Sequence, residues 1–197
     1  MKVEVIKIAK MIFDRKLVNG SSGNISFKEN DLIQISNSGS CFGLLENDSF
    51  SSIDINGNIE NGTPSKEFPL HLSIYNISLK TKCIIHTHSF YSTLFTCLNN
   101  FENHVSFLFS YTPYLKIKTN SKIGCIQYYR PGSRELFEAF QKKVDEDIKV
   151  YFLGNHGIVV CEEDPYKAFC LLEEVEYSIK NYLEIYNPSF EDYHRIE

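Results

Sequence analysis

Apolar residues recur at helical spacing in several stretches of the chain, and polar or glycine-containing segments separate these stretches. The first stretch stops at Asn19-Gly20, a pair typical of a helix end, and Ser89 can cap a later one. The last begins at Asp164-Pro165, where aspartate can cap the helix and proline suits its first turn. The helices predicted in this way cover residues 5–17, 67–79, 89–95, 134–144 and 165–186.

Short apolar runs bounded by turn residues predict the strands. The predicted strands cover residues 25–27, 32–35, 52–55, 83–85, 115–117, 126–129, 150–153 and 158–161. The first two are parted by a charged turn and predict a hairpin. Because the strands outnumber the helices that could cross between them, we expect an α/β fold with a mixed sheet and helices on its faces. No linker or repeat interrupts the pattern, so residues 1–197 are expected to form a single domain.

Composition and charge narrow the class of protein. The net charge of −5 is spread over segments of mixed sign, without the basic stripe that binds nucleic acid. The N-terminal segment lacks the continuous apolar run of a signal peptide or membrane span, so we expect a cytoplasmic protein without a membrane partner. The six cysteines form no CxxC pair and are expected to be reduced thiols without a role in the chemistry.

Three histidines stand at or near the ends of predicted strands. His86 and His88 follow the run 83–85, and alternate side chains of an extended segment leave on one face, where both rings can bind one ion. The alternative is a pair of packed or solvated histidines. His156 follows the run 150–153 and lies between two glycines; alone it would be a polar residue at a loop tip. Together, three imidazoles leave a position open on zinc, as in catalytic sites.

Two further residues lie on the predicted helix 67–79. Glu67 can ligate a metal or act as a general base, although a glutamate in a first helical turn often only favours the helix dipole. His71 is four residues further on and is expected to be structural or to support a ligand. His104 and His194 have no supporting partners in the sequence and are expected to be surface residues.

Two turns rich in serine and glycine lie beside predicted strands, at residues 21–24 and 36–40. Such turns offer backbone N–H groups and short hydroxyl side chains to an anion, although ordinary turn chemistry explains the same composition. Neither contains the GxxxxGK[ST] sequence of a nucleotide-binding loop. A small phosphate monoester is therefore the predicted ligand.

The order of the motifs GSSGNIS, ISNSGS, PSKE, HTHS and NHG resembles the class II aldolase/adducin family over residues 20–186. The resemblance implies that family's single-domain fold and one zinc ion per subunit. It implies that His86, His88 and His156 hold the metal, and that Glu67 is both a ligand and the acid/base. It also implies a phosphate site, formed by Ser21, Asn24, Ser38, Gly39 and Ser65.

The resemblance further implies a homotetramer with fourfold symmetry and active sites at the subunit interfaces. Tyr114, which follows a proline, matches a tyrosine that reaches a neighbouring subunit's site.

Several segments look more like the decarboxylases of 3-oxo-tetronate 4-phosphate than like the fuculose-phosphate aldolases. They are SGSCFGLL, SKEFPLHLSIY, TPYLKIK and YYRPGSREL. Lys66 stands between Ser65 and Glu67, where the aldolases often have a second serine, and its ammonium can pair with a substrate anion or point to solvent. The expected function is a zinc lyase that converts the phosphorylated keto acid to dihydroxyacetone phosphate and CO2. The alternatives are a fuculose-phosphate type aldolase and a non-catalytic binding protein.

Overall fold

The computed structural model describes residues 1–196, which contain one eight-stranded sheet. Neighbouring strands are antiparallel except β6 and β7, which are parallel, so the mixed sheet predicted from the sequence is confirmed. In spatial order the strands are β4 (Ile59–Asn61), β3 (Phe50–Ile53), β2 (Leu32–Ser36), β1 (Asn24–Glu29), β5 (Cys83–Thr87), β8 (Gly157–Glu162), β7 (Val150–Leu153) and β6 (Gly124–Ile126).

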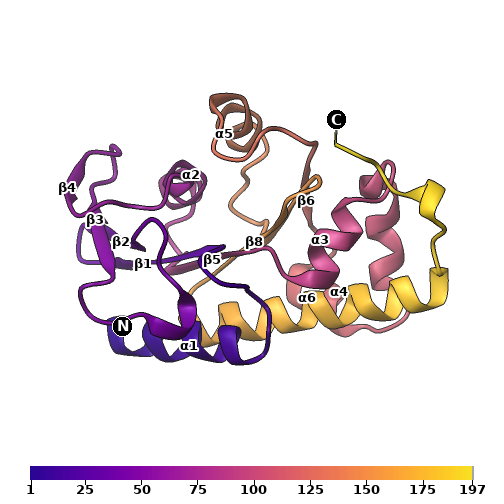
Figure 1. Cartoon of the computed structure of the whole chain (residues 1–197), viewed down its shortest axis with the longest axis horizontal. Helices are drawn as coiled ribbons and strands as arrows, with labels where there is room; N and C mark the ends of the chain where they lie inside the picture. Colours follow the sequence, from indigo (N-terminus) through magenta and orange to yellow (C-terminus); the bar gives the residue numbers. More distant parts are fainter. Residues whose placement is uncertain (197) are drawn as a thin grey trace.

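Helices cover both faces of this sheet (Figure 1). One face packs against α1 (Lys2–Asp14), α3 (Phe90–Thr96) and α6 (Pro165–Tyr186), and the other against α2 (Phe68–Ile77) and α5 (Arg134–Gln141). The short α4 (Tyr114–Thr119) and the 3-10 helix η2 (Phe101–Phe109) lie against α6. Two further 3-10 helices are η1 (Phe42–Leu44) and η3 (Phe190–Asp192). Within residues 1–196, the helices lack the length and apolar character needed to cross a membrane.

Alternation along the central strands divides the core into two layers. In β5, Cys83 and Ile85 join the cluster under α1 and α6, whereas Ile84 joins the cluster under α2 and α5. His86 follows the same alternation as Ile84, so its ring lies on the α2 side of the sheet, where Glu67 precedes α2. This alternation directs a polar side chain from a fully buried strand toward the glutamate.

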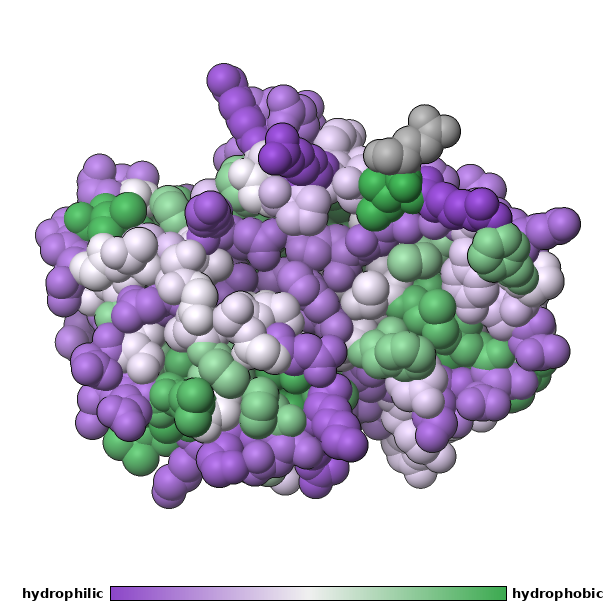
Figure 2. Space-filling view, in the orientation of Figure 1, coloured by the Kyte–Doolittle hydropathy of each residue, from purple (hydrophilic) through white to green (hydrophobic). Residues whose placement is uncertain are grey.

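On the face drawn in Figure 2, hydrophobic residues gather over the region of α3, and hydrophilic residues occupy the middle of the face. Phe90, the first residue of α3, is 66% exposed. Contiguous exposed apolar surface of this kind is more often an interaction surface than an accident of composition.

The strand predicted at residues 115–117 is wrong, because this segment forms α4. Its buried residues are Leu115 and Thr119, which are four apart and therefore lie on one helical face. The Thr119 hydroxyl also donates to the Leu115 carbonyl, at 2.7 Å. Two apolar residues, Leu115 and Ile117, alternate with lysines and match the strand period, but the segment is too short to separate a strand pattern from a helix pattern.

Other element boundaries differ from the prediction by a few residues. The first helix ends at Asp14 rather than at Leu17, because Lys16 has a positive φ of 61° that breaks the helical path. The strands predicted at 52–55 and 126–129 are observed as β3 and β6, each starting two residues earlier. The predicted hairpin, the strands at 83–85, 150–153 and 158–161, and the last helix are confirmed.

All six cysteines are free thiols. Cys83 and Cys161 are buried, and burial raises the pKa of Cys161 to about 12. A thiol with so high a pKa is a poor nucleophile at neutral pH, which agrees with its packing role in the core.

Candidate metal centre and substrate pocket

The pairing of β5 with β8 brings the three histidines together. His86 lies within β5, and His88 comes directly after the last residue of that strand. His156 lies in the turn between β7 and β8, and the antiparallel register pairs Thr87 with Ile158. The end of β5 and the start of β8 therefore meet at one edge of the sheet, where all three rings converge.

The ring nitrogens and the Glu67 carboxylate surround one point. His86 Nε2 lies 3.0 Å from His88 Nε2 and 3.0 Å from Oε2 of Glu67. His156 Nε2 lies 3.3 Å from the other carboxylate oxygen, Oε1. The ligand atoms of all four residues lie within 4.8 Å of one another. Three imidazoles and a carboxylate match the donor set that zinc prefers, with room for a further oxygen ligand.

The hydrogen bonds of this group fit a bound cation. His86 Nδ1 lies 2.9 Å from the carbonyl oxygen of Ile158, which can only accept, so Nδ1 carries the proton. In the neutral ring, Nε2 then presents a bare lone pair to the Glu67 carboxylate, an arrangement that needs a proton or a metal ion between the two atoms. Glu67 Oε1 and both ring nitrogens of His156 are buried without a hydrogen-bond partner among residues 1–196. A divalent metal ion would satisfy Glu67 Oε1 and Nε2 of His156, the ring nitrogen that faces it.

The electrostatics keep two of the rings neutral. Burial, followed by the charge of His86, lowers the pKa of His156 to about 3 and that of His88 to about 4. Burial opposes the charged form of His86 too, but the Glu67 carboxylate outweighs it and raises the pKa of His86. Burial likewise opposes ionisation of Glu67, but the nearby imidazoles, first of all His86, hold its pKa well below its usual value. Neutral imidazoles and an ionised carboxylate are the forms that bind metal.

A pocket of about 320 Å³ opens beside this group. It combines the turn before β1, the turn after β2 and the segment before α2 with two of the histidines. Its walls include all five residues predicted for the phosphate site, and also Lys66. These lining residues are Ser21, Asn24, Ser38, Gly39, Ser65 and Lys66, together with Glu67, His88 and His156. His86 is fully buried and does not line the pocket.

Backbone hydrogen bonds hold the walls together. Ser38 N donates to the carbonyl of Thr63 at 2.9 Å, and Ser65 N donates to the carbonyl of Ser36 at 3.2 Å. The turn after β2 thus lies against the segment that leads to Glu67. The Asn24 amide donates to Glu67 Oε2 at 3.5 Å, which connects the wall formed by the turn before β1 to the carboxylate.

Gly23 is required where the first turn meets β5. Its φ is +76°, and a Cβ atom there would lie 2.7 Å from the carbonyl oxygen of His86. Both the left-handed backbone and the close approach exclude a larger side chain. The glycine therefore lets the serine-rich turn lie directly against the strand that carries His86.

Tyr114 does not line this pocket. It is the first residue of α4 and is 60% exposed, so its hydroxyl is available to a neighbouring molecule. Its participation in a neighbouring subunit's site stays a prediction.

The remaining histidines lie outside the group. His71 is fully buried, and its Nδ1 lies 2.7 Å from Ser26 Oγ, which places it beneath the site as a structural residue. His194 is exposed, as predicted. His104, expected at the surface, is instead half-buried and forms a hydrogen bond with the hydroxyl of Tyr182, at 2.5 Å. Because Tyr182 is distant along the chain, the sequence around His104 does not indicate this contact.

Five lining residues were not identified from the sequence. They are Ser22, Gly23, Asn37, Pro131 and Gly132. The first three belong to the predicted serine-rich turns, so widening the set to whole turns would have found them. The last two carry only an ordinary turn signal, and nothing local indicates that this turn reaches the pocket.

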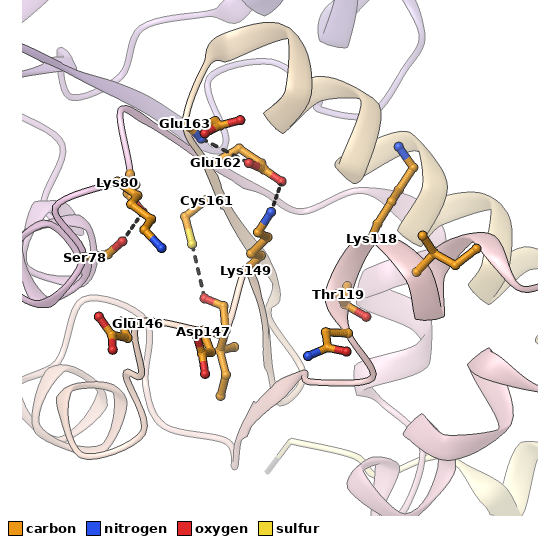
Figure 3. A pocket seen from close by; sticks show the side chains of 14 residues that line it. Ser78, Lys80, Lys118, Thr119, Glu146, Asp147, Lys149, Cys161, Glu162 and Glu163 are labelled. Carbon is orange, nitrogen blue, oxygen red and sulfur yellow. Dashed lines mark hydrogen bonds and ion pairs between the residues drawn. The ribbon is translucent and has the colours of Figure 1, made fainter.

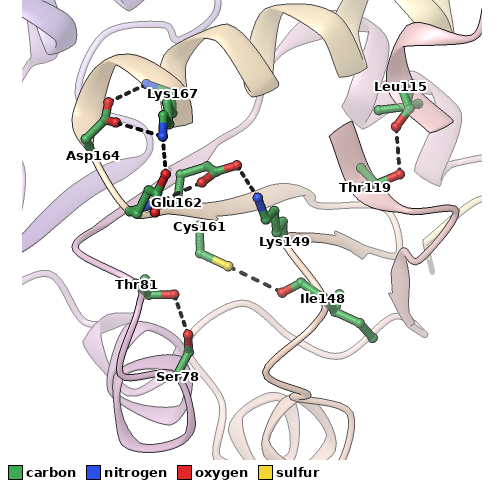
Figure 4. A network of polar contacts seen from close by, with 11 residues as sticks. Ser78, Thr81, Leu115, Thr119, Ile148, Lys149, Cys161, Glu162, Asp164 and Lys167 are labelled. Carbon is green, nitrogen blue, oxygen red and sulfur yellow. Dashed lines mark hydrogen bonds and ion pairs between the residues drawn. The ribbon is translucent and has the colours of Figure 1, made fainter. Parts of the chain in front are cut away.

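A second cavity of about 380 Å³ lies at the opposite end of β5 and β8, among residues such as Lys80, Lys149, Cys161 and Glu162 (Figure 3). Opposite charges compensate there: Lys149 pairs with Glu162 at 2.7 Å, and Cys161 Sγ donates to the Ile148 carbonyl. The polar contacts continue through Lys167 to the start of α6 (Figure 4). No histidine lines this cavity, whereas His88 and His156 line the smaller pocket.

Comparison with known proteins agrees with the fold. Residues 3–183 match the family model described as Class II Aldolase and Adducin N-terminal domain. The L-fuculose phosphate aldolase of Methanocaldococcus jannaschii is 39% identical over 179 residues, which are 91% of this chain and 93% of that protein. The 3-oxo-tetronate 4-phosphate decarboxylase of Pectobacterium atrosepticum is 33% identical over 181 residues, which are 91% of this chain and 82% of that protein. The crystal structure of YgbL from Escherichia coli superposes with a TM-score of 0.81 at 28% identity, covering 98% of this chain and 92% of that one. The chain therefore belongs to the class II aldolase and adducin family.

Proposed function

We propose that this protein is a zinc-dependent lyase that breaks a carbon–carbon bond in a small phosphorylated keto compound. The observation that carries the proposal is the common location of two groups of residues. The cluster of His86, His88, His156 and Glu67 borders the same pocket as the hydroxyl- and glycine-rich turns. A substrate with a phosphate at one end would thus present its reacting carbons to the metal centre at the other.

His86, His88 and His156 would hold one zinc ion per chain, with Glu67 as a fourth ligand before substrate binds. When bound, the ion supplies Lewis-acid polarisation of the substrate's keto and hydroxyl oxygens, a contribution of several kcal/mol. His86 is oriented for this role by its hydrogen bond to the Ile158 carbonyl.

Ser21, Asn24, Ser38, Gly39 and Ser65 would bind the phosphate through short side chains and backbone N–H groups. Glu67 is positioned to move a proton, because its carboxylate is both at the metal centre and on the wall of the pocket. In either of the two reactions below, the electron pair of the broken bond stays on the keto fragment as an ene-diolate. Protonation of that carbon, by Glu67 or Tyr114, then yields dihydroxyacetone phosphate.

Aldol cleavage of a ketose 1-phosphate of the L-fuculose type is the first candidate. The relative named for that activity is 39% identical over 91% of this chain, against 33% for the decarboxylase. In this reaction Glu67 would take the proton of the C4 hydroxyl as the C3–C4 bond breaks, and an aldehyde would leave.

Decarboxylation of 3-oxo-tetronate 4-phosphate is the second candidate, and Lys66 favours it. The lysine lines the pocket between Ser65 and Glu67 and adds a cation to walls whose other polar side chains are hydroxyls, amides, two imidazoles and one carboxylate. A sugar acid brings both a carboxylate and a phosphate, so a cation beside the metal centre suits it better than it suits a sugar phosphate, whose phosphate is its single anionic group.

We further propose that the protein works as a homotetramer in which Tyr114 completes a neighbouring site. The segment that carries the tyrosine exposes a series of large apolar side chains, as an interface would require. They are Phe107 (49% exposed), Tyr111 (47%), Tyr114 (60%) and Ile117 (72%).

The test supplies zinc-loaded protein with L-fuculose 1-phosphate and, separately, with 3-oxo-tetronate 4-phosphates of each configuration. Dihydroxyacetone phosphate with an aldehyde and no CO2 would establish the aldolase, and CO2 release would establish the decarboxylase. His156→Ala serves as the inactive control. Zinc-loaded protein that acts on none of these compounds would refute the proposed function.

A further inference from the structure

A charged residue is buried in the middle of α6. Glu176 is 6% exposed, and the residues beside it on the inner face of the helix, Val175 and Ile179, are fully buried and apolar. An ionisable side chain at such a position costs stability unless hydrogen bonds compensate for its lost hydration. We infer that Glu176 is a positioning residue that fixes α3 and, through α3, sets His88 and His156 in place for metal binding. This inference rests on the proposed metal centre.

The Glu176 carboxylate accepts four hydrogen bonds from the first turn of α3. Oε1 accepts from the Ser89 hydroxyl at 2.7 Å, from Ser92 N at 2.7 Å and from the Ser92 hydroxyl, and Oε2 accepts from Tyr91 N at 3.2 Å. N–H groups of a first helical turn have no partner within their own helix. Ser89 occupies the N-cap position but makes no capping bond, contrary to the prediction. The carboxylate of α6 caps the helix in its place.

This cap lies next to a metal ligand. His88 is the one residue between Thr87, the end of β5, and Ser89, the N-cap of α3. Hydrogen bonds of the sheet hold its backbone on one side, and the bonds to Glu176 hold it on the other. The direction in which the His88 ring leaves the chain therefore depends on where α3 begins.

The same helix contacts the turn that carries the third histidine. The Thr93 hydroxyl donates to the His156 carbonyl at 3.4 Å, and Asn155 N donates to the Thr96 carbonyl at 3.0 Å. The two ligands that lie outside a strand thus both contact α3. His86 differs, because it belongs to β5 and is oriented by Ile158.

Without the carboxylate, core packing would still hold the body of α3, but the start of the helix would lose its four bonds to α6. α3 has seven residues, too few for a stable helix by itself. Ser89 and Ser92 are buried, so their hydroxyls and the Ser92 N–H would lose their partners where water has poor access. A shift of α3 that relieved this would move His88 and the His156 turn together.

The experiment measures zinc affinity by competition with a chromophoric chelator in wild type, Glu176→Gln and Glu176→Ala. Glutamine keeps an acceptor oxygen of the same reach but turns an NH2 group toward the Tyr91 N–H, whereas alanine removes every bond. We expect zinc affinity to fall by roughly tenfold or more in Glu176→Ala and by less in Glu176→Gln, as for other residues that orient metal ligands. Glu173→Gln is the matched control, because Glu173 lies one turn earlier on α6 and pairs with Arg15 at the surface.

A second readout needs no metal. Hydrogen exchange in the metal-free proteins should be faster at the Asn155 amide in both Glu176 variants than in wild type, because that amide donates to α3. Glu176 variants that lose thermal stability but keep wild-type zinc affinity and Asn155 exchange would overturn the inference, leaving a purely structural carboxylate. If Glu176→Ala does not fold, Glu176→Gln decides the question alone. Wild-type protein that binds no zinc would instead refute the metal centre and, with it, this role.

Discussion

Nε2 of His156 lies 3.3 Å from Oε1 of Glu67, and this contact joins the turn between β7 and β8 to the residue that precedes α2. Burial keeps the imidazole neutral by lowering the pKa of His156 to about 3, while the carboxylate is ionised. The two side chains share no hydrogen bond. A cation between them would turn an unsatisfied buried pair into two metal ligands, and this is the basis of the first prediction.

Replacing His156 by alanine should reduce the zinc content from about one ion per chain to near zero and abolish lyase activity. Metal analysis of the purified protein after dialysis measures the first effect. His104→Ala is the matched control, because that half-buried histidine bonds Tyr182 away from the pocket and should leave the zinc content unchanged. A His156→Ala protein with a full complement of zinc would argue against the site.

Lys66→Ser should raise KM and lower kcat/KM by roughly tenfold, about 1.4 kcal/mol, for a phosphorylated keto acid. The loss should be smaller for L-fuculose 1-phosphate, which carries only one anionic group. The zinc content should not change, because Lys66 is not a ligand. Steady-state kinetics with both substrates measures how far the loss of kcat/KM differs between them. Lys142→Ser, which removes an exposed lysine at the end of α5, is the control. Equal kinetics in wild type and Lys66→Ser would show that the lysine faces solvent.

Gly23→Ala should destabilise the protein by about 1–3 kcal/mol and raise KM. Its new Cβ atom would push the serine-rich turn away from the His86 carbonyl, 2.7 Å away. Gly20→Ala is a close control: its φ is also positive, at +54°, but nothing lies within 4 Å of the added atom. Urea unfolding and substrate kinetics of the two variants separate the contact from the backbone strain. Equal effects of both substitutions would mean that only the strain matters.

Tyr114→Phe and His86→Ala should each be inactive alone but regain partial activity when unfolded together and reassembled. In mixed oligomers some sites would combine an intact metal set from one chain with an intact tyrosine from its neighbour. A mixture of His86→Ala and His88→Ala should stay inactive, because no chain in it has a complete metal set. Absence of recovery in oligomers shown to be mixed would assign the tyrosine to its own subunit.

Acid should destabilise the metal-free protein through His71. Burial, followed by the charge of His86, lowers the pKa of His71 to about 3, whereas an unfolded chain binds the proton near pH 6.5. Between these values the unfolded state holds more protons, so stability falls as the pH falls through this range. From pH 7 to pH 5 the expected loss is about 2 kcal/mol.

Urea unfolding of chelator-treated wild type and His71→Gln at both pH values isolates this contribution. Glutamine can still bond Ser26 but does not titrate, so the variant should lose about 2 kcal/mol less than wild type over the same interval. Parallel losses in the two proteins would assign the acid sensitivity to other groups.

How much of the site could be predicted depended on whether its residues carry a local signal. His86 and His88 could be placed, because strand alternation and a buried apolar run fix their geometry within a few residues. Glu176 could not, although a charge among apolar positions of the last helix was visible in the sequence. Its partners at the start of α3 are remote along the chain, so only the packing of α6 against α3 reveals what the carboxylate does.

The same contrast applies to the fold. Long segments with a clear period, such as α6, were predicted nearly to the residue, whereas the segment 115–117 offered too few residues to distinguish a strand from a helix. α4 packs on α6 and η2, and those tertiary contacts decide its conformation.

The central position of β5 has a kinetic consequence. Its two neighbours in the sheet, β1 and β8, precede and follow it at long distances along the chain, so neither pairing can form as a local hairpin. Closing such loops is slow, and folding dominated by distant strand pairs takes milliseconds to seconds. His86 and His88 come from the end of β5 and His156 from the turn before β8, so no early, partly folded chain can hold the ion with all three rings. In a refolding experiment, tight zinc uptake should therefore rise with the slowest phase, and the metal would stabilise the finished sheet without accelerating its assembly.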